Sequence, residues 1–350
     1  MLRVGLTGGI ACGKSRVLRR LAEHGLATLD LDSVSHQLLE PEGAAYAEVV
    51  AAFGEGILGP ERRVDRKALG ARVFGDEAAR ERLNAIVHPK VRDEEARRAA
   101  VLENLAQIAS TGHPGLADSK SRGRAARSMF ESHHRGWMEY LGRPAALAMP
   151  AGSAFRVSGT EFLYRAVARG RGAILAMPHL GNWEIVGVGL TRLGLRMHTV
   201  TGVQFHPLLA GQVRALKERA GIRVTTLQDG FAPLVSALRG GEIVALLVDG
   251  DVYSRSLPAD FFGRRVAFPA GPAILARRAR VPILHGHAVR GAGGEHSFTF
   301  DGLDEPDFTL PLREDLCRLT AGVARAQERN IAAHVGQWCI FRPIWGADAA

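Results

Sequence analysis

Short apolar runs alternate with amphipathic stretches from about residue 170 onward. Mostly apolar runs predict buried strands at 173–177, 197–203, 222–227, 243–249 and 281–289. Between them, apolar residues recur at helical spacing in 183–194, 208–221, 231–241 and 270–280. Apolar strands that alternate with helices are typical of a mainly parallel sheet covered by helices. We therefore expect an α/β domain in this part of the chain.

The first hundred residues have a different pattern. An apolar strand is expected at 2–6, a helix at 16–25 and a second strand at 26–32, after which residues 33–100 are mostly helical in pattern. Residues 110–124 are rich in Gly, Ser and charge, as expected of a loop. We expect two domains, a partial module of two strands plus helices at 1–98 and the α/β domain at 103–346.

Charge distinguishes these two regions further. The chain has 350 residues, 46% of them hydrophobic and 23% charged, and a formal net charge of +9, as in a globular protein with a basic excess. Residues 1–100 hold 16 Lys and Arg against 15 Asp and Glu, whereas residues 101–350 hold 29 against 21. The excess suits an anionic membrane surface, an acidic carrier protein, a phosphate-bearing substrate or a nucleic acid. Three widely spaced cysteines without a CxxC pair favour reduced thiols in the cytosol.

A phosphate-binding motif lies between the first expected strand and helix. The pattern G-x-x-x-x-G-K-[ST] is fitted by Gly8, Gly9, Ile10, Ala11, Cys12, Gly13, Lys14 and Ser15. The backbone N–H groups of such a loop and the following helix N-terminus surround phosphate oxygens. Lys14 is expected to reach the β- and γ-phosphates, and Ser15 to ligate Mg²⁺. The motif predicts a site for ATP and Mg²⁺.

The segments around this motif carry a family resemblance. GLTGGIACGKS, LDLD, FGEGIL, VDRKALGARVF and LNAIVHP occur in this order, and the run resembles the N-terminal half of dephospho-coenzyme A kinase. The resemblance implies ATP-dependent phosphorylation of the 3′-hydroxyl of dephospho-CoA. It implies that Asp32 accepts the hydroxyl proton and that Arg66 and His88 lie near the CoA site. It ends near residue 98, before the family's further strands and arginine-bearing lid.

A second chemical motif follows the strand at 173–177. His179 lies where open α/β sheets hold their active sites, and Glu184 follows at H-x4-E spacing. A histidine there deprotonates an acceptor hydroxyl, while a carboxylate holds its tautomer and stabilises the imidazolium. Gly181 allows the turn that this pairing requires. The spacing predicts a charge-relay pair of His179 and Glu184.

The order of segments around this motif is more specific than the motif. HLGNWE, KERAGIRV, the run from DGFAPLV to VDGD, FFGRRVAFPAG, VPILHGHAVR and QWCIFRPIW resemble the lipid A biosynthesis (lauroyl/myristoyl) acyltransferase family, which includes phosphatidylinositol mannoside acyltransferases. The resemblance covers about 103–346. It implies transfer of a fatty acyl group from acyl carrier protein or CoA to a hydroxyl of a lipid or glycolipid, without a cofactor.

The resemblance also assigns roles to individual residues. His179 is the implied general base and Glu184 its partner. The implied substrate contacts are Asn182, Arg219, Asp249 and Arg290. Gly250 follows Asp249 where the family usually has Gln. His285 and His287 alternate on one expected strand, but no third metal ligand is indicated.

The leading hypothesis is an acyltransferase in the cytoplasm, peripheral to the inner face of the plasma membrane. Its expected partners are an acyl-ACP or acyl-CoA donor, a lipid or glycolipid acceptor and the membrane surface, and no nucleic acid. One alternative is a dephospho-CoA kinase using ATP and Mg²⁺. A second is a non-catalytic module that binds a nucleotide or CoA beside the transferase, and a third is a join produced by a deletion or an assembly error.

Overall fold

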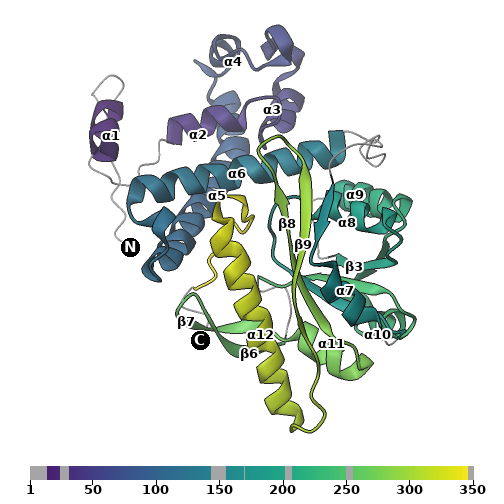
Figure 1. Ribbon diagram of the computed structural model, residues 1–350. Helices are drawn as coiled ribbons and strands as arrows, with labels where there is room; N and C mark the ends of the chain where they lie inside the picture. Colours follow the sequence, from purple (N-terminus) through teal and green to yellow (C-terminus); the bar gives the residue numbers. More distant parts are fainter. Residues whose placement is uncertain are drawn as a thin grey trace. The chain divides into compact units, whose positions relative to one another are not determined.

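The computed structural model describes residues 14–23, 31–142, 155–168, 170–201, 207–249 and 255–345 (Figure 1). The chain divides into two compact units. The first unit comprises Met1–Leu105, Leu116–Gly123 and Phe341–Pro343, and the second comprises Ala106–Gly115, Arg124–Ile340 and Ile344–Ala350. The boundary expected at 98–103 falls within one continuous helix, α5 (Glu77–Ser110).

The described part of the first unit is helical. Its helices are α1 (Lys14–Glu23), α2 (Leu31–Leu38), α3 (Tyr46–Phe53), α4 (Arg66–Val73) and the first part of α5. Buried apolar side chains of α2 to α5, and of the turn after α3, form one core that includes Val34, Val49, Ile57, Leu69 and Val87. The strand expected at 2–6 and residues 26–30 of the second expected strand lie outside the described residues. Leu31 and Asp32, expected to end that second strand, instead begin α2.

Helix α5 ends at Ser110, nearly three turns beyond the helical pattern that ends near residue 100. Val101, Leu105 and Ile108 are fully buried, and their spacing of four and three residues places them on one face of the helix. Pro89 lies inside α5 without ending it, although proline removes one intrahelical hydrogen bond. Burial of an apolar face therefore decides the length of this helix.

A seven-stranded sheet forms the centre of the second unit, in the order β1-β9-β8-β2-β5-β3-β4. Its strands are β1 (Arg156–Ser158), β2 (Ala173–Met177), β3 (Met197–Thr201), β4 (Arg223–Thr226), β5 (Ile243–Leu247), β8 (Ile283–Arg290) and β9 (His296–Asp304). All neighbours are parallel except β8 and β9, which are antiparallel. The mainly parallel sheet expected from the apolar runs is confirmed.

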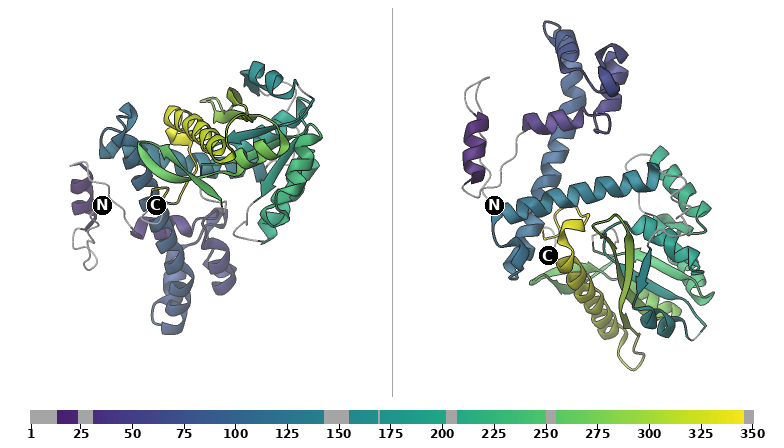
Figure 2. Two further views of the ribbon diagram at one scale, coloured as in Figure 1. Left: turned by 90° about the horizontal axis from the view of Figure 1, so that it is seen from below. Right: turned by 45° about the horizontal axis from the view of Figure 1, so that its top comes forward.

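Helices cover both faces of this sheet (Figures 1 and 2). On one face, Leu163 and Val186 pack with Leu175 and Phe298 in a single apolar core. Every residue of β2 is buried, as required of a central strand covered on both sides. The described helices of the second unit include α6 (Ser119–Gly142) from Arg124 onward, α7 (Thr160–Val167), α8 (Trp183–Arg192), α9 (Pro207–Arg219), α10 (Ala232–Arg239), α11 (Gly271–Ala279) and α12 (Leu312–Ala333).

A separate hairpin, β6 (Ser256–Phe261) and β7 (Arg264–Pro269), packs against α12. Its two-residue turn is Phe262-Gly263, with φ angles of 48° and 72°, which match the backbone twist of a tight hairpin. The Phe261 ring is fully buried and stacks on Trp345 at 5.6 Å between centroids. These aromatic side chains therefore belong to the core of the second unit.

None of the described helices combines the length and the apolar character needed to cross a membrane. The apolar side chains of α6 are divided between interior and surface. Met129 is fully buried, whereas Met138 is 48% exposed.

We predict that Asp315→Ala strongly destabilises the second unit. The Asp315 carboxylate is fully buried and lies 3.0 Å from Arg277 and 2.6 Å from Arg318. Its removal leaves the nearly buried Arg277 without its partner, so we expect a loss of about 3 kcal/mol in unfolding free energy, measured by urea denaturation. The control is Asp260→Ala, which removes an exposed ion pair with Arg265 at 3.6 Å and changes stability by less than about 0.5 kcal/mol. Equal losses in both variants would contradict the prediction.

Candidate active site

The loop after β2 carries His179 at the carboxyl edge of the sheet. Strand β2 lies between β5 and β8, and Pro178 and His179 follow directly after its last residue. Gly181 has a φ of 61°, and a Cβ at this position would lie 2.7 Å from the carbonyl oxygen of Ala288 on β8. Only glycine therefore allows the loop to turn this close to the neighbouring strand.

The register of the sheet places His179 beside Asp249. Strands β2 and β5 are parallel, with Met177 opposite Leu247, and His179 and Asp249 each follow two residues later. His179 Nδ1 lies 2.6 Å from Asp249 Oδ1. The backbone N–H of His179 donates to Asp249 Oδ2 at 2.8 Å. Two residues far apart in sequence thus form a histidine–carboxylate pair at the edge of the sheet.

The Asp249 carboxylate is fully buried and stays ionised. Burial alone raises its pKa, but the charge on His179 and the hydrogen bonds from His179 and Trp338 outweigh burial and hold the pKa of Asp249 below its ordinary value. A carboxylate at this distance fixes the imidazole proton on Nδ1 and leaves Nε2 as a proton acceptor. The His179 side chain is 21% exposed and packs edge-on against the Trp183 ring, with 5.1 Å between centroids. This arrangement is suited to a general base.

The expected pairing of His179 with Glu184 is wrong. Glu184 lies in the first turn of α8, and its Oε1 is 3.0 Å from Lys217 Nζ on α9. Because the chain enters a helix directly after Asn182, it does not fold Glu184 back toward His179. The expected substrate contact of Asp249 also needs correction, since its carboxylate is buried and bonded to His179 and Trp338.

Asn182 has a structural place in this loop. Its Oδ1 accepts from the backbone N–H of Ile185 at 3.2 Å and thereby caps α8. Its Nδ2 donates to the Gly136 carbonyl at 3.2 Å and to Glu139 Oε2 at 2.9 Å, both on α6. The amide expected to contact substrate is therefore buried and bonded within the protein.

Arg290, at the end of β8, is buried and paired. Its guanidinium donates to Glu139 at 3.0 and 2.6 Å, in a two-point contact, and to Ser132 Oγ at 3.3 Å. Burial opposes ionisation of Glu139, but hydrogen bonds from His296, Arg290 and Asn182 lower the pKa of Glu139 to about 2. Arg290 thus neutralises a carboxylate of α6, in contrast to its expected contact with substrate. Arg219 is exposed at the end of α9, and its expected contact with an anion stays a prediction.

The roles of Asp249 and Trp338 beside His179 were not predicted from the sequence. Asp249 was recognised as the end of a strand but was not matched to His179. The available signal was that each residue follows its apolar run at the same offset. Trp338 donates from Nε1 to Asp249 Oδ2 at 2.7 Å. Nothing in the local pattern around residue 338 indicates this long-range contact.

The expected kinase residues lie in the first unit. Residues 8–13 of the phosphate loop are outside the described residues, Lys14 and Ser15 begin α1, and Asp32 lies in the first turn of α2. Arg66 begins α4 and lies 4.0 Å from Glu40. His88 is exposed on α5. Their roles in phosphoryl transfer stay predictions.

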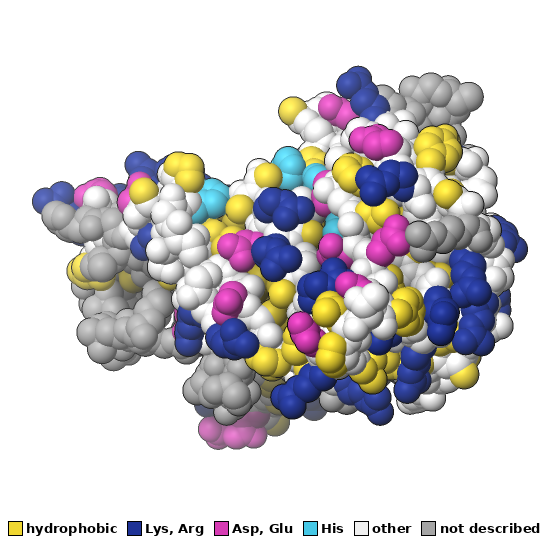
Figure 3. All heavy atoms as spheres, turned by 60° about the horizontal axis from the view of Figure 1, so that its bottom comes forward, with side chains coloured by type: hydrophobic (Ala, Val, Ile, Leu, Met, Phe, Trp, Pro, Cys, Tyr) yellow, Lys and Arg dark blue, Asp and Glu magenta, His cyan; other side chains and the backbone are white. Residues whose placement is uncertain are grey.

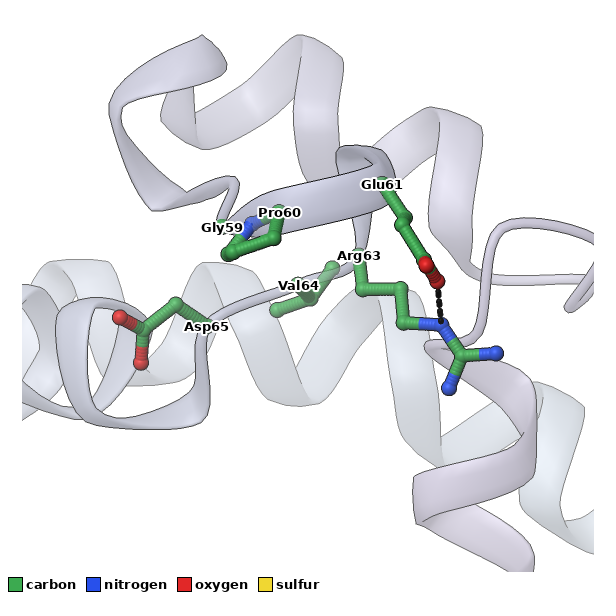
Figure 4. A pocket seen from close by; sticks show the side chains of 6 residues that line it. All are labelled: Gly59, Pro60, Glu61, Arg63, Val64 and Asp65. Carbon is green, nitrogen blue, oxygen red and sulfur yellow. Dashed lines mark ion pairs between the residues drawn. The ribbon is translucent and has the colours of Figure 1, made fainter.

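A pocket lies at the turn after Leu58 (Figure 4), where Leu58 and Val64 form an antiparallel bridge. Arg63 points across the turn toward Glu61, with 3.6 Å between the paired atoms, and also contacts Glu40 at 3.3 Å. The pocket is lined by Gly59, Pro60, Glu61, Arg63, Val64 and Asp65. Carboxylates therefore neutralise the arginine that lines it.

Across the described ranges, no three or more His, Cys, Asp and Glu side chains are grouped to hold a metal ion. His285 lies 2.9 Å from Asp304, and His287 lies 2.8 Å from Asp301. Each histidine of the alternating pair on β8 thus has its own carboxylate partner on β9.

Comparison with known families identifies the larger part of the chain. The family model of bacterial lipid A biosynthesis acyltransferases matches residues 71–346. The chain belongs to this family. The model of dephospho-CoA kinase matches residues 2–127, so the N-terminal part is similar to a second enzyme family. The two matches overlap in 71–127, a stretch that includes all of α5.

Curated relatives of the N-terminal part are named dephospho-CoA kinase. The protein from Thermobifida fusca is 56% identical over 91 residues, which cover 26% of this chain and 46% of the relative. The protein from Leifsonia xyli is 44% identical over 124 residues, covering 35% of this chain and 63% of the relative. The chain spans about half the length of the curated relatives it matches.

We predict that Glu139 stabilises the fold in a pH-dependent way. Its pKa is lowered from 4.5 to about 2, so its stabilising effect is complete above about pH 4.5 and is lost as the pH falls toward 2. Glu139→Gln should cost about 2 kcal/mol at pH 7, because Arg290 remains buried without its carboxylate. Urea denaturation at pH 7, 4 and 2.5 measures the gap between variant and wild type. A gap that stays constant down to pH 2.5 would contradict this assignment.

Proposed function

We propose that the second unit transfers a fatty acyl group from acyl-CoA or acyl carrier protein to a hydroxyl of a lipid or glycolipid, such as a lipid A-like or phosphatidylinositol mannoside-like acceptor. The observation that carries this proposal is the His179–Asp249 pair at the carboxyl edge of the sheet. Membership of the acyltransferase family supports it. The pair supplies the proton acceptor that attack by a hydroxyl requires.

The reaction begins when His179 Nε2 takes the proton of the acceptor hydroxyl. The hydroxyl oxygen attacks the thioester carbonyl, and the resulting tetrahedral intermediate collapses with cleavage of the C–S bond. The imidazolium returns its proton to the departing thiolate, so an ester and a free thiol are formed. Asp249 stabilises the imidazolium between these two proton transfers.

The charge of the second region suits the proposed partners. Residues 101–350 carry the basic excess, and Lys and Arg side chains are prominent on the face drawn in Figure 3. Acyl carrier protein, CoA and anionic lipid headgroups are all acidic, so such a surface favours their approach. We propose a location at the inner face of the plasma membrane, held peripherally, and Arg219 as an exposed contact for an anionic group.

We predict that His179→Ala lowers kcat/KM for acyl transfer by about 10³-fold or more, because the hydroxyl loses its general base. Asp249→Asn should cost a comparable factor, since an amide no longer fixes the productive tautomer. Glu184→Gln should cost only about tenfold, because Glu184 pairs with Lys217 and not with the imidazole. Purified protein is assayed with acyl-CoA or acyl carrier protein and membrane lipids, and products are measured by mass spectrometry.

The matched control is His287→Ala, which removes another histidine paired with an aspartate in the same sheet, at 2.8 Å. It should lower stability without a comparable effect on kcat/KM. Undiminished transfer by His179→Ala, or no transfer by the wild type with any donor, would overturn the proposed function. A larger loss in Glu184→Gln than in Asp249→Asn would restore Glu184 as the partner.

A second candidate function is favoured by the N-terminal similarity. We propose that residues 1–98 bind ATP with Mg²⁺. If this part of the chain is also catalytically active, it phosphorylates dephospho-CoA. The motif from Gly8 to Ser15 supports nucleotide binding, and the described residues Lys14–Glu23 are helical, as expected after a phosphate loop. Named kinases with up to 56% identity in this region support the substrate class.

We predict that Lys14→Ala weakens ATP binding at least tenfold, because the lysine ammonium contacts the phosphates. Isothermal titration calorimetry of the full chain measures binding, and ADP release with dephospho-CoA measures turnover. ATP binding without turnover would favour a non-catalytic nucleotide-binding module. Equal ATP affinity in wild type and Lys14→Ala would argue against a working phosphate loop.

A further inference from the structure

The segment Gln337–Cys339, just after α12, is bonded along the loop that carries His179. The backbone N–H of Cys339 donates to the His179 carbonyl at 2.7 Å, and the N–H of Gly181 donates to the Gln337 carbonyl at 3.1 Å. Leu180 and Trp338 form an antiparallel bridge between these two bonds. The segment thus acts as a short strand paired with residues 179–181.

The Gln337 side chain ties the same segment to β8. Its Oε1 accepts from the Arg290 backbone N–H at 2.9 Å, and its Nε2 donates to the Arg290 carbonyl at 2.8 Å. Both the oxygen and the nitrogen of the Gln337 amide are therefore hydrogen-bonded to the backbone of Arg290, as the backbone groups of a paired strand would be. This contact fixes the segment relative to the central sheet.

This pairing places the Trp338 indole against the buried side of Asp249. The indole is fully buried, and its Nε1 donates to Asp249 Oδ2 at 2.7 Å. Oδ2 also accepts from the backbone N–H of His179, whereas Oδ1 faces His179 Nδ1. With Oδ2 held by two donors, the carboxylate cannot rotate without breaking both bonds.

We infer that Trp338 is a positioning residue of the acyltransferase, which holds the Asp249 carboxylate so that Oδ1 is presented to His179 Nδ1. The inference rests on the proposed function of the His179–Asp249 pair. Trp338 touches neither the reacting hydroxyl nor the thioester in this assignment. It acts through Asp249, both by fixing its orientation and by sharing its negative charge.

Because Trp338 shares the negative charge of Asp249, its removal should shift the pH dependence of activity in a definite direction. Removal of the indole N–H concentrates the negative charge of Asp249, which favours the imidazolium form of His179 more strongly. The acid limb of the pH–rate profile, where activity is lost by protonation of His179, should then move to higher pH. The buried Cys339 thiol interacts with the charge of Asp249, and its pKa is raised to about 12 by burial and by that charge. The Cys339 thiol therefore stays protonated near neutral pH and does not contribute to this limb.

The first test is Trp338→Phe, which removes the donor and keeps an aromatic ring. We expect kcat to fall by about tenfold at pH 7 and the acid limb to move up by about half a pH unit. The matched control is Trp345→Phe, which removes an indole donor bonded to the Phe261 carbonyl at 3.1 Å in the same unit. This control should lower stability similarly and leave the limb in place. A limb that does not move in Trp338→Phe, or that moves equally in both variants, overturns the inference.

A second test separates the donor from the shape of the ring. Incorporation of β-(3-benzothienyl)alanine at position 338 replaces the indole N–H by sulfur with nearly the same volume. The limb should move as it does in Trp338→Phe, even where Trp338→Phe folds poorly. An unchanged limb in this protein shows that packing alone is responsible and overturns the inference.

A third readout does not depend on activity. In protein labelled with ¹⁵N-histidine, the His179 ring signals, assigned by their loss in His179→Gln, should report a proton fixed on Nδ1 in the wild type. The sulfur analogue should weaken this preference and move the ring titration to higher pH. If the wild type transfers no acyl group, the proposed function fails while this spectrum still tests the contact. If His179→Ala is inactive but the spectrum is unchanged by the analogue, only the inference about Trp338 fails.

Discussion

The parallel pairing of β2 with β5 is the constraint on which the candidate site depends. With Met177 opposite Leu247, the next residues leave the sheet together, and the Val248 N–H still donates to the Met177 carbonyl at 3.1 Å. Side chains alternate between the faces of a strand, so a slip of one residue would turn Asp249 away from His179. Burial of the whole of β2 fixes this register, because any slip exposes apolar side chains or buries polar ones.

Around this pair, donors from distant elements of the second unit stabilise the carboxylates of Asp249 and Glu139. Asp249 receives bonds from the His179 loop and from Trp338, and Glu139 of α6 receives the Arg290 guanidinium. A buried carboxylate costs free energy unless it is paired and hydrogen-bonded. Here the bonds that satisfy the carboxylates also join α6, β8 and the C-terminal segment to the loop that holds the imidazole. Stability and catalytic geometry therefore rest on the same contacts.

The apolar runs predicted β2, β5 and their neighbours well because a strand buried on both faces has no polar positions to interrupt it. The hairpin β6–β7 was not predicted as strands, since exposed residues such as Asp260 and Arg264 alternate with its buried ones. Helix α12 was also missed, although it is amphipathic and buries Leu319 and Val323. The Trp338 contact depends on tertiary pairing alone, which no local pattern specifies.

The H-x4-E spacing has a physical origin that differs from its expected one. Asn182 caps α8, and a carboxylate two residues later lies in the first turn, where the helix dipole and Lys217 both stabilise negative charge. The position of Glu184 is thus set by the start of a helix, whereas the partner of His179 is set by the neighbouring strand. In this parallel sheet, the residue at the equal offset after the adjacent strand, Asp249, lies 2.6 Å from His179, whereas Glu184 pairs with Lys217. An acid that is near a histidine in sequence is for this reason weaker evidence of a pair than an acid at the matching offset of the next strand.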